Sequence, residues 1–159
     1  MKSPILILGS NSFAGSNFCD HLLNKKIKVI GVSRSKEINK IFLKYKSNKY
    51  YKKNFSFHKV DLNKNLNKLI KLIKIKKIKY IVNFASQGMV AESWNKPWDW
   101  YNTNVVSFSK LTNQLKDLKL IKFLNFSTPE VYGNTVSRIK ENIIFNPSTP
   151  YIKNFTFIF

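Results

Sequence analysis

The stretch Ile5-Leu6-Ile7-Leu8 runs directly into Gly9-Ser10-Asn11-Ser12-Phe13-Ala14-Gly15, after which a helical pattern begins. The apolar residues predict a buried strand, and the glycine-containing segment predicts a tight turn into a helix. Gly9 would let the chain turn, and Gly15 would let the helix pack closely on the strand. In sheets of this kind, the N–H groups of the turn and the helix dipole bind the pyrophosphate of a dinucleotide. Ser12 stands where the usual fingerprint has its middle glycine, so the segment by itself fits a structural turn about as well.

Apolar strand-like runs and helical runs alternate along the rest of the chain. We expect strands at residues 5–8, 27–32, 55–60, 79–84 and 121–127. We expect helices at 13–24, 62–75 and 97–118, and a lysine-rich helix or loop at 36–46. Strict alternation, with strands that are apolar on both sides, predicts a parallel sheet covered on both faces. The expected fold is therefore a Rossmann-like, doubly wound α/β fold with five strands in the order 3-2-1-4-5, whose ligands lie beyond the carboxyl ends of the strands.

The chain has 159 residues, enough for one domain with a buried core, and a formal net charge of +20. Its lysines are spread with asparagine and isoleucine over most of the chain, as in 64–68 and 74–79. A general bias in composition explains this spread better than a dedicated basic patch, so we expect no nucleic-acid partner. A basic nucleic-acid-binding protein is kept as an alternative function. The charge favours anionic ligands such as nucleotide sugars.

Several classes of protein are not expected from this sequence. It has no run of 18 apolar residues and no segment that resembles a signal peptide, so we expect neither a membrane span nor export. Cys19 is the only cysteine, which excludes an internal disulfide and fits a reducing, cytoplasmic environment. We interpret Cys19 as a small core residue of the helix 13–24, and we expect no metal site.

Polar residues follow the second and third expected strands, where a dinucleotide would place its adenosine. Ser33 and Arg34 occupy the position of the acidic residue that would hydrogen-bond a ribose 2′-hydroxyl. Because a guanidinium pairs bidentately with phosphate, Arg34 favours NADP over NAD, unless it is a solvated loop residue. Asp61 suits a hydrogen bond from the adenine amine and equally suits an N-cap for a helix from Leu62 onward.

Small residues follow the fourth expected strand. The run Asn83-Phe84-Ala85-Ser86-Gln87-Gly88 would let a cofactor lie close to the backbone. The next segment is rich in aromatic residues, and we interpret Trp94, Trp98 and Trp100 as core or interface anchors rather than substrate contacts.

Hydroxyl and carboxyl groups follow the fifth expected strand. Ser127-Thr128-Pro129-Glu130 places a hydroxyl and a carboxylate at the mouth of the sheet, where they can polarise a carbonyl and move a proton. Further along, Tyr151 follows a proline-containing segment where the chain re-enters the site. A tyrosine hydroxyl beside a nicotinamide acts as an acid or a base when a nearby cation lowers its pKa.

In this order, the motifs resemble those of the extended short-chain dehydrogenase/reductase family, in its nucleotide-sugar epimerase and dehydratase branch. The resemblance covers almost the whole chain. It rests on the glycine turn, Asp61, Asn83 to Ser86, Asn104 in its helix, Ser127 to Gly133, and the spacing from Glu141 through Pro147 to Tyr151. Residues 87–90 and 92–94 look most like the dTDP-glucose and GDP-mannose 4,6-dehydratases.

The resemblance implies an NAD(P)-dependent 4,6-dehydratase or epimerase with redox chemistry at C4 of a nucleotide sugar. It implies that Thr128 hydrogen-bonds the sugar O4, that Tyr151 is the base for hydride transfer, and that Glu130 abstracts a proton. Gln87 and Ser127 would contact the substrate. The implied cofactor residues are Gly9, Asn11, Ser12, Phe13, Ala14, Gly15, Ser33, Arg34, Asp61, Leu62, Phe84, Ala85, Ser86 and Asn104. Family relatives often dimerise through the helix after the fourth strand, which implies a homodimer through 97–118.

Two departures from the family pattern bear on catalysis. Pro129 stands where dehydratases carry an acidic aspartate, so epimerisation or simple redox chemistry stays open. Phe155 replaces the lysine expected four residues after the tyrosine, and Lys153 is only two residues on. We therefore expect a dinucleotide-binding domain at 1–151, an atypical tail at 152–159, no C-terminal substrate domain, and little or no activity. The alternative is a non-catalytic dinucleotide-binding half-domain.

Overall fold

The computed structural model describes residues 3–133, 138–140, 145–149, 151 and 153. By their internal contacts these residues form two compact units. The sheet unit comprises the residues up to 85 together with 111–126, and the second unit comprises 86–110 and the described residues from 127 onward. Apart from Lys153, the tail predicted at 152–159 lies outside the described residues.

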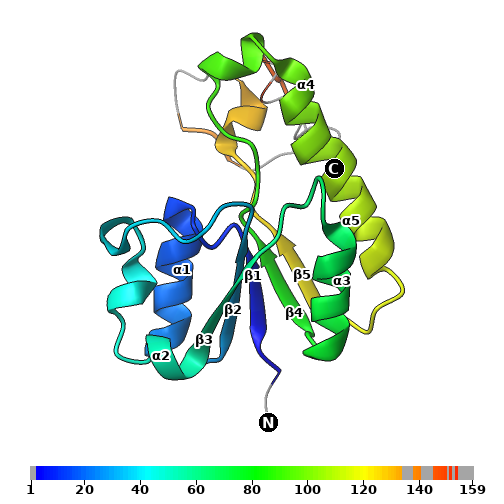
Figure 1. The fold of residues 1–159 in the computed structure, drawn as a ribbon. Coiled ribbons are helices and arrows are strands. Elements are labelled where there is room, and N and C mark those ends of the chain that lie inside the picture. The colour runs from blue at the N-terminus through cyan, green and yellow to red at the C-terminus, as the bar shows by residue number, and fades with distance from the viewer. Residues whose placement is uncertain (1–2, 134–137, 141–144, 150, 152, 154–159) are drawn as a thin grey trace. The chain divides into compact units, whose positions relative to one another are not determined.

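The sheet unit contains five parallel strands in the predicted order β3-β2-β1-β4-β5 (Figure 1). They are β1 (Ile5–Leu8), β2 (Val29–Ser33), β3 (Phe55–Lys59), β4 (Tyr80–Asn83) and β5 (Lys122–Asn125). The register places Leu8, the last residue of β1, opposite Val32 and Asn83. The predicted fold class and strand order are confirmed, and the polar segments that follow the strands all start at one edge of the sheet.

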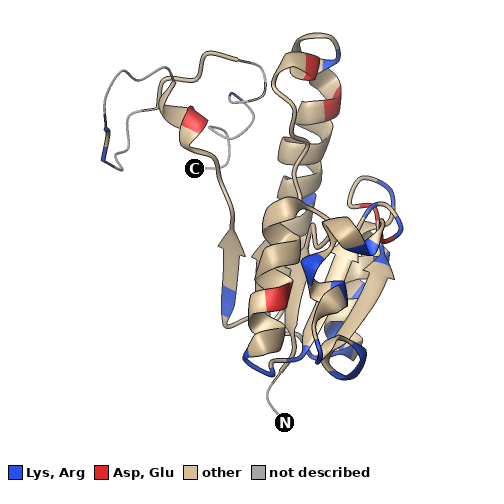
Figure 2. Cartoon of the chain, turned by 90° about the vertical axis from the view of Figure 1, so that its left-hand side faces the viewer, with Lys and Arg blue, Asp and Glu red and all other residues tan. Residues whose placement is uncertain are grey.

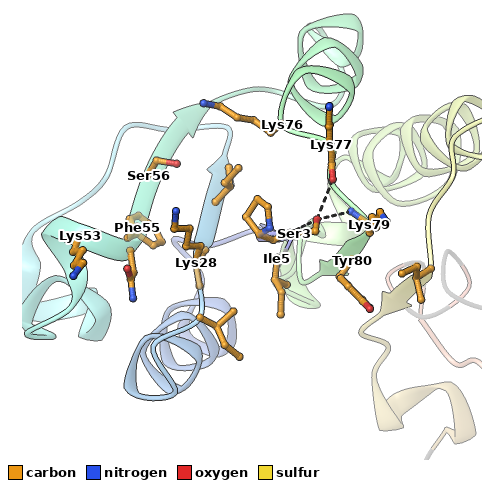
Figure 3. Close-up of a pocket in the computed structure, with 16 residues that line it drawn as sticks. Ser3, Ile5, Lys28, Lys53, Phe55, Ser56, Lys76, Lys77, Lys79 and Tyr80 are labelled. Carbon is orange, nitrogen blue, oxygen red and sulfur yellow. Dashed lines mark hydrogen bonds between the residues drawn. The ribbon is translucent and has the colours of Figure 1, made fainter. Parts of the chain in front are cut away.

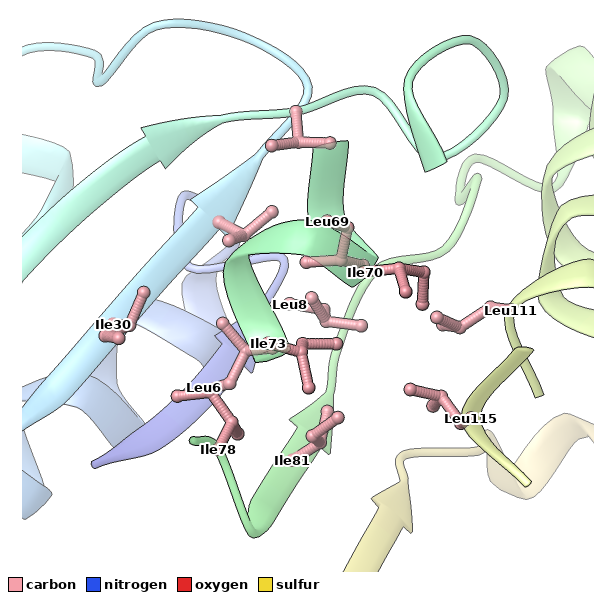
Figure 4. Close-up of a cluster of buried hydrophobic side chains, with 12 residues drawn as sticks. Leu6, Leu8, Ile30, Leu69, Ile70, Ile73, Ile78, Ile81, Leu111 and Leu115 are labelled. Atoms are coloured by element: carbon pink, nitrogen blue, oxygen red, sulfur yellow. The ribbon is translucent and has the colours of Figure 1, made fainter. Parts of the chain in front are cut away.

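Helices cover both faces of the sheet, as strands that are apolar on both sides predict. The helix α1 (Phe13–Asn24) packs on one face, to which Ile7 contributes. The helices α3 (Leu66–Ile75) and α5 (Phe108–Leu115) pack on the other, to which Leu6 contributes. Figure 4 shows this second cluster, which consists of Leu6, Leu8, Ile30, Val32, Val60, Leu69, Ile70, Ile73, Ile78, Ile81, Leu111 and Leu115. Burial of each such Leu or Ile contributes about 1.5–3 kcal/mol, so the cluster fixes the sheet unit firmly.

Cys19 lies on the buried face of α1, as predicted. Burial, with a smaller contribution from the Asp20 carboxylate, raises the pKa of its thiol well above the usual value. The thiol therefore stays protonated and behaves as a small core group.

The third helix begins later than predicted. The apolar pattern places it at 62–75, whereas α3 begins at Leu66. The carboxylate of Asp61 accepts a hydrogen bond from the N–H of Asn63 at 2.9 Å, and its C=O accepts one from the N–H of Asn65 at 2.7 Å. Asp61 thus closes a turn before the helix, because an aspartate readily bonds the backbone two residues on. The N-cap interpretation of Asp61 is therefore wrong.

The lysine-rich segment contains only short helical turns. Residues Lys40–Phe42 and Lys44–Ser47 form 3-10 turns, and the short helix α2 (Tyr51–Asn54) follows. Of the two structures predicted for residues 36–46, a helix or a loop, the observed one is therefore mainly a loop.

The long helix expected at 97–118 is present in three consecutive parts. These are α4 (Pro97–Trp100), a π-helical stretch (Tyr101–Ser107) and α5, which ends at Leu115. Pro97 lies in the first turn, as predicted. Two further 3-10 turns, Ala91–Trp94 and Pro129–Tyr132, are not predicted by the apolar pattern.

Positive charge is distributed over many elements of the described chain. Figure 2 shows Lys and Arg on several helices and on the connecting loops, with far fewer Asp and Glu. The full sequence has 28 Lys and Arg against 8 Asp and Glu.

Replacing Gly9 with alanine should destabilise the chain by about 2–4 kcal/mol, as measured by urea unfolding. Gly9 has a φ of +78°, and an added Cβ would lie 2.7 Å from the backbone N of Ala85 and from the carbonyl C of Phe84. Gly88→Ala is the matched control, since a Cβ there meets no atom of the described residues within 4 Å. Equal midpoints for the two variants would contradict the account of this turn.

Candidate functional site

Ser12 holds the turn between β1 and α1. Its hydroxyl accepts a hydrogen bond from the N–H of Gly15 at 3.0 Å and donates one to the C=O of Gly9 at 2.8 Å. Ser12 is therefore the N-cap of α1, a position that serine fills well. The capping role explains how a serine replaces the middle glycine of the fingerprint while the turn is kept.

The first turn of α1 offers two N–H donors to a ligand. No acceptor for the N–H groups of Phe13 and Ala14 occurs in the part of the chain that the structure describes. First-turn N–H groups have no partner inside a helix, and the positive end of the helix dipole lies at the same place. These two donors fit an anionic group such as the pyrophosphate of a dinucleotide.

Asn11 and Ser33 connect this turn to the loop after β2. The buried hydroxyl of Ser33 accepts a hydrogen bond from the N–H of Asn11 at 3.0 Å. The side-chain Nδ2 of Asn11 donates to the C=O of Lys36 at 2.9 Å. The structure thus brings these two predicted cofactor residues together, but it uses them to hold the loop. Arg34 lies in the same loop and is exposed.

Glu37 anchors the far end of this loop, which the sequence did not predict. Its carboxylate accepts hydrogen bonds from the hydroxyl of Tyr45 at 2.9 Å and of Tyr51 at 3.4 Å, and it lies 3.8 Å from Nζ of Lys46. Burial, followed by the hydrogen bond to Glu37, raises the pKa of Tyr45, so its hydroxyl stays a donor. The tyrosines lie 8 and 14 residues away along an irregular segment, where no periodic pattern pairs them with Glu37.

Phe84 and Ala85 follow β4 and lie against Gly9 through their backbone atoms. The side chain of Asn83 accepts the N–H of Ala85 at 3.1 Å and so shapes this segment. The ring of Phe84 packs in the apolar cluster under α1, and Leu62 packs in the cluster on the opposite face. Only the backbone of Phe84 is therefore left to face a ligand near the turn.

In the second unit, Asn104 fixes the segment that carries Gln87. Asn104 is only 4% exposed. Its Oδ1 accepts a hydrogen bond from the N–H of Gln87 at 2.7 Å, and its Nδ2 donates to the C=O of Gln87 at 3.1 Å. The amide group of Asn104 is thus engaged with the backbone of Gln87, and its predicted role toward a cofactor stays a prediction. Ser86 precedes this pair and is exposed.

The three predicted catalytic residues lie together in the second unit. Thr128 caps the turn Pro129–Tyr132, with its Oγ1 3.5 Å from the N–H of Glu130. A hydrogen bond joins the side chains of Thr128 and Tyr151. Tyr151 packs in a small apolar cluster around the buried Val131. The grouping provides a hydroxyl pair beside a carboxylate, which can orient and move a proton.

The pKa of Tyr151 is raised from its ordinary value, whereas a catalytic base needs a lowered one. Burial is the main cause, the hydrogen bond with Thr128 acts in the opposite direction, and the Glu130 carboxylate raises the pKa further. Lys153 is exposed, and its N–H donates to the C=O of Thr149 at 3.0 Å, as in a helical turn. Position 155, where the resemblance predicts a lysine, lies outside the described residues.

The three tryptophans differ in burial. Trp100 is 3% exposed, as a core residue should be, whereas Trp94 and Trp98 are 61% and 62% exposed. The Nε1 of Trp100 and the Oγ of Ser127 are buried polar atoms for which the described chain supplies no hydrogen-bond partner. The substrate role expected of Ser127 stays a prediction.

The described residues meet neither the requirements of a metal site nor those of a membrane-spanning helix. Among these residues, no group of three or more His, Cys, Asp and Glu side chains gathers in a way that would hold a metal ion. None of the described helices is long and apolar enough to cross a membrane.

The model of the GDP-mannose 4,6 dehydratase family matches residues 6–153. The chain belongs to this family. The predicted resemblance to nucleotide-sugar epimerases and dehydratases is thereby confirmed.

The proteins similar to this family member include an epimerase and a 4,6-dehydratase. Protein CapI of Staphylococcus aureus is 30% identical over 135 residues, 84% of this chain and 40% of that protein. UDP-glucuronate 4-epimerase of Thermodesulfobacterium geofontis is 26% identical over 149 residues, 92% of this chain and 46% of that protein. The structure of dTDP-glucose 4,6-dehydratase of Bacillus anthracis, in complex with NAD, is 28% identical with a TM-score of 0.78 and covers 98% of this chain and 47% of that one. The chain spans less than half the length of these relatives.

The predicted site residues of this GDP-mannose 4,6 dehydratase family member fall into the two units. The sheet unit carries Gly9, Asn11, Ser12, Phe13, Ala14, Gly15, Ser33, Arg34, Asp61, Leu62, Phe84 and Ala85. The second unit carries Ser86, Gln87, Asn104, Ser127, Thr128, Glu130 and Tyr151. All three predicted catalytic residues therefore lie in the second unit, which also carries the predicted cofactor residues Ser86 and Asn104, whereas the other predicted cofactor residues lie in the sheet unit.

A lysine-lined cavity of about 1080 Å³ lies in the sheet unit (Figure 3). Five lysines line it, together with apolar side chains such as Ile5 and Phe55. The hydroxyl of Ser3 donates to the C=O of Lys77 at 3.0 Å and accepts from the N–H of Lys79 at 3.1 Å, which fixes part of the wall. The lining includes the first residues of β1, β2, β3 and β4, so the cavity lies at the strand ends opposite to those where dinucleotides bind.

Asn104→Ala should destabilise the chain by about 2–3 kcal/mol, because it removes the two hydrogen bonds that Asn104 makes to the N–H and C=O of Gln87. The exposed Asn102 in the same helical stretch is the matched control, and Asn102→Ala should change the stability by less than about 0.5 kcal/mol. Urea unfolding measures both. A small effect of Asn104→Ala would show that the pair does not hold the segment.

Proposed function

We propose that the chain forms the cofactor-binding part of an NAD(P)-dependent enzyme acting at C4 of a nucleotide sugar, as a 4,6-dehydratase or an epimerase. The observation that carries the proposal is the grouping of Thr128, Glu130 and Tyr151 on a chain that also has the glycine turn. Family membership and the names of its relatives, a 4-epimerase and a 4,6-dehydratase, support the same class of reaction.

Each residue of the catalytic group has one task in this proposal. A bound nicotinamide dinucleotide would supply the hydride acceptor for C4. Thr128 would hydrogen-bond the sugar O4, and Tyr151 would take the proton of the C4 hydroxyl while the C4–H bond breaks. In the dehydratase form of the reaction, Glu130 would then take the C5 proton, which the resulting 4-keto group makes acidic; epimerisation at C4 needs no such step. Ser127 and Gln87 would contact the sugar.

Pro129 separates the two reaction types. Dehydration requires a proton donor for the departing C6 hydroxyl, and a proline side chain has no proton to give. Epimerisation requires return of the hydride to C4 from the other face of the sugar and needs no such donor. The residue at position 129 therefore favours epimerisation within the proposed reaction class.

A non-catalytic dinucleotide-binding half-domain is the second candidate. The raised pKa of Tyr151 favours it, because a phenol that stays protonated at neutral pH cannot accept the substrate proton. The glycine turn and its two N–H donors serve this candidate equally well.

The cofactor in this proposal is NADP, with NAD as the alternative. Arg34 lies in the loop after β2, where its guanidinium would pair with a 2′-phosphate. The relative from Bacillus anthracis was crystallised with NAD, which supports NAD as the alternative cofactor. We further propose a cytoplasmic location and a homodimer through 97–118, with no nucleic-acid partner.

Arg34→Ala should weaken NADPH binding about 10-fold and leave NADH binding within about twofold, as measured by isothermal titration calorimetry. Loss of one guanidinium–phosphate pair costs about 1.4 kcal/mol, which is tenfold in affinity. Arg138→Ala removes the same charge from an exposed residue and should change neither affinity. A parallel loss for both cofactors would contradict the assigned role of Arg34.

Turnover of a nucleotide sugar by this chain should rise about 10-fold per pH unit above neutrality, because only the phenolate of Tyr151 accepts a proton. Chromatography of the nucleotide-sugar products measures turnover with dTDP-glucose and UDP-glucuronate, because the hydride returns to the sugar in each cycle and no reduced cofactor accumulates. Tyr151→Phe should abolish turnover and keep the affinity for NADPH within about twofold. Turnover that is independent of pH, or equal in the variant, would exclude Tyr151 as the base. Cofactor binding without turnover at any pH would establish the half-domain.

A further inference from the structure

Glu37 is the one acidic residue between β2 and α2, in a segment that also contains Arg34. Acidic residues after the second strand of dinucleotide-binding sheets ordinarily bind the ribose hydroxyls. Here the carboxylate is engaged elsewhere, since the hydroxyls of Tyr45 and Tyr51 and the ammonium of Lys46 surround it.

The hydroxyl of Tyr45 is a fixed anchor for this carboxylate. Tyr45 is fully buried, and its ring stacks on Phe55 of β3 with 4.4 Å between the ring centroids. The same hydroxyl lies 3.4 Å from Oδ1 of Asn11 in the glycine turn. Glu37 is therefore linked, through one buried side chain, to the sheet and to the turn.

Only three residues, Arg34, Ser35 and Lys36, separate this anchor from Ser33. Ser33 is tied to the turn by the N–H of Asn11, and the C=O of Lys36 accepts from the side chain of Asn11. A short loop that is fixed at both ends has few conformations, so little entropy is lost when it meets a ligand.

We propose that Glu37 sets the preference of the chain for a 2′-phosphorylated dinucleotide by holding the loop that presents Arg34, without touching the cofactor itself. The inference rests on the proposed function. Glu37 is thus a positioning residue. An acidic residue after the second strand ordinarily favours NAD, whereas Glu37 would favour NADP because it holds the loop that carries Arg34.

Binding of NADPH and NADH to the full chain, by calorimetry, tests this role. Glu37→Ala should lower the affinity for NADPH at least 5-fold and that for NADH by less than twofold. Glu37→Gln keeps an oxygen that accepts from Tyr45 and should stay within twofold of the unaltered chain for both. Glu92→Ala, the loss of an exposed acid in the second unit, is the matched charge control.

Three other outcomes would overturn the inference, and the affinities for NADPH and NADH distinguish them from one another. A simple charge effect would raise the affinity for NADPH in the Ala and Gln variants alike, because each removes a negative charge. A purely structural role would lower both affinities equally. Binding of neither cofactor by the unaltered, folded chain would overturn the proposed function and this inference with it.

Hydrogen exchange supplies a readout that needs no ligand. The amides of residues 34–36 should exchange at least 5-fold faster in Glu37→Ala than in Glu37→Gln, because only the first variant frees the loop. Equal exchange in the two variants would contradict the proposed anchor.

Discussion

The approach of the Gly9 backbone to the segment after β4 is the constraint on which the site depends. A side chain at position 9 would lie within 3 Å of the backbone of Phe84 and Ala85, and the positive φ of Gly9 suits glycine in any case. The turn can therefore begin directly at the carboxyl end of β1. As a result, α1 starts with two N–H groups available at the edge where ligands bind parallel sheets.

Within each unit, several polar side chains hold loops in place. Ser12 caps α1, Ser33 and Asn11 hold the loop after β2, and Asn104 holds the backbone of Gln87 in the second unit. Such residues act on a ligand indirectly, because they fix the backbone that meets it.

Much of the architecture could be predicted from the sequence because apolar periodicity and glycine spacing are local signals. They predicted the parallel sheet and the helix Phe13–Asn24 correctly. The strand order was predicted from the dinucleotide-binding fold that the motifs indicate, because pairing between distant strands is not a local signal. The predicted start of α3 was wrong because the side chain of Asp61 accepts a hydrogen bond from the backbone of its own turn. The apolar pattern contains no information about this bond. The anchor at Glu37 could not be predicted, since it joins residues across an irregular segment through a buried tyrosine. The raised pKa of Tyr151 likewise depends on burial, which the residue spacing does not contain.

The central claim is that the start of α1 binds the pyrophosphate of a dinucleotide. Titration of the ¹⁵N-labelled chain with NADPH, followed by amide chemical shifts, tests it most directly. The account predicts that the largest shifts occur at Phe13 and Ala14, with further shifts at Arg34. Shifts confined to the lysine-lined cavity, at residues such as Lys28 and Lys53, would contradict the claim, because they would show that the charge of the chain and not its glycine turn attracts the anion.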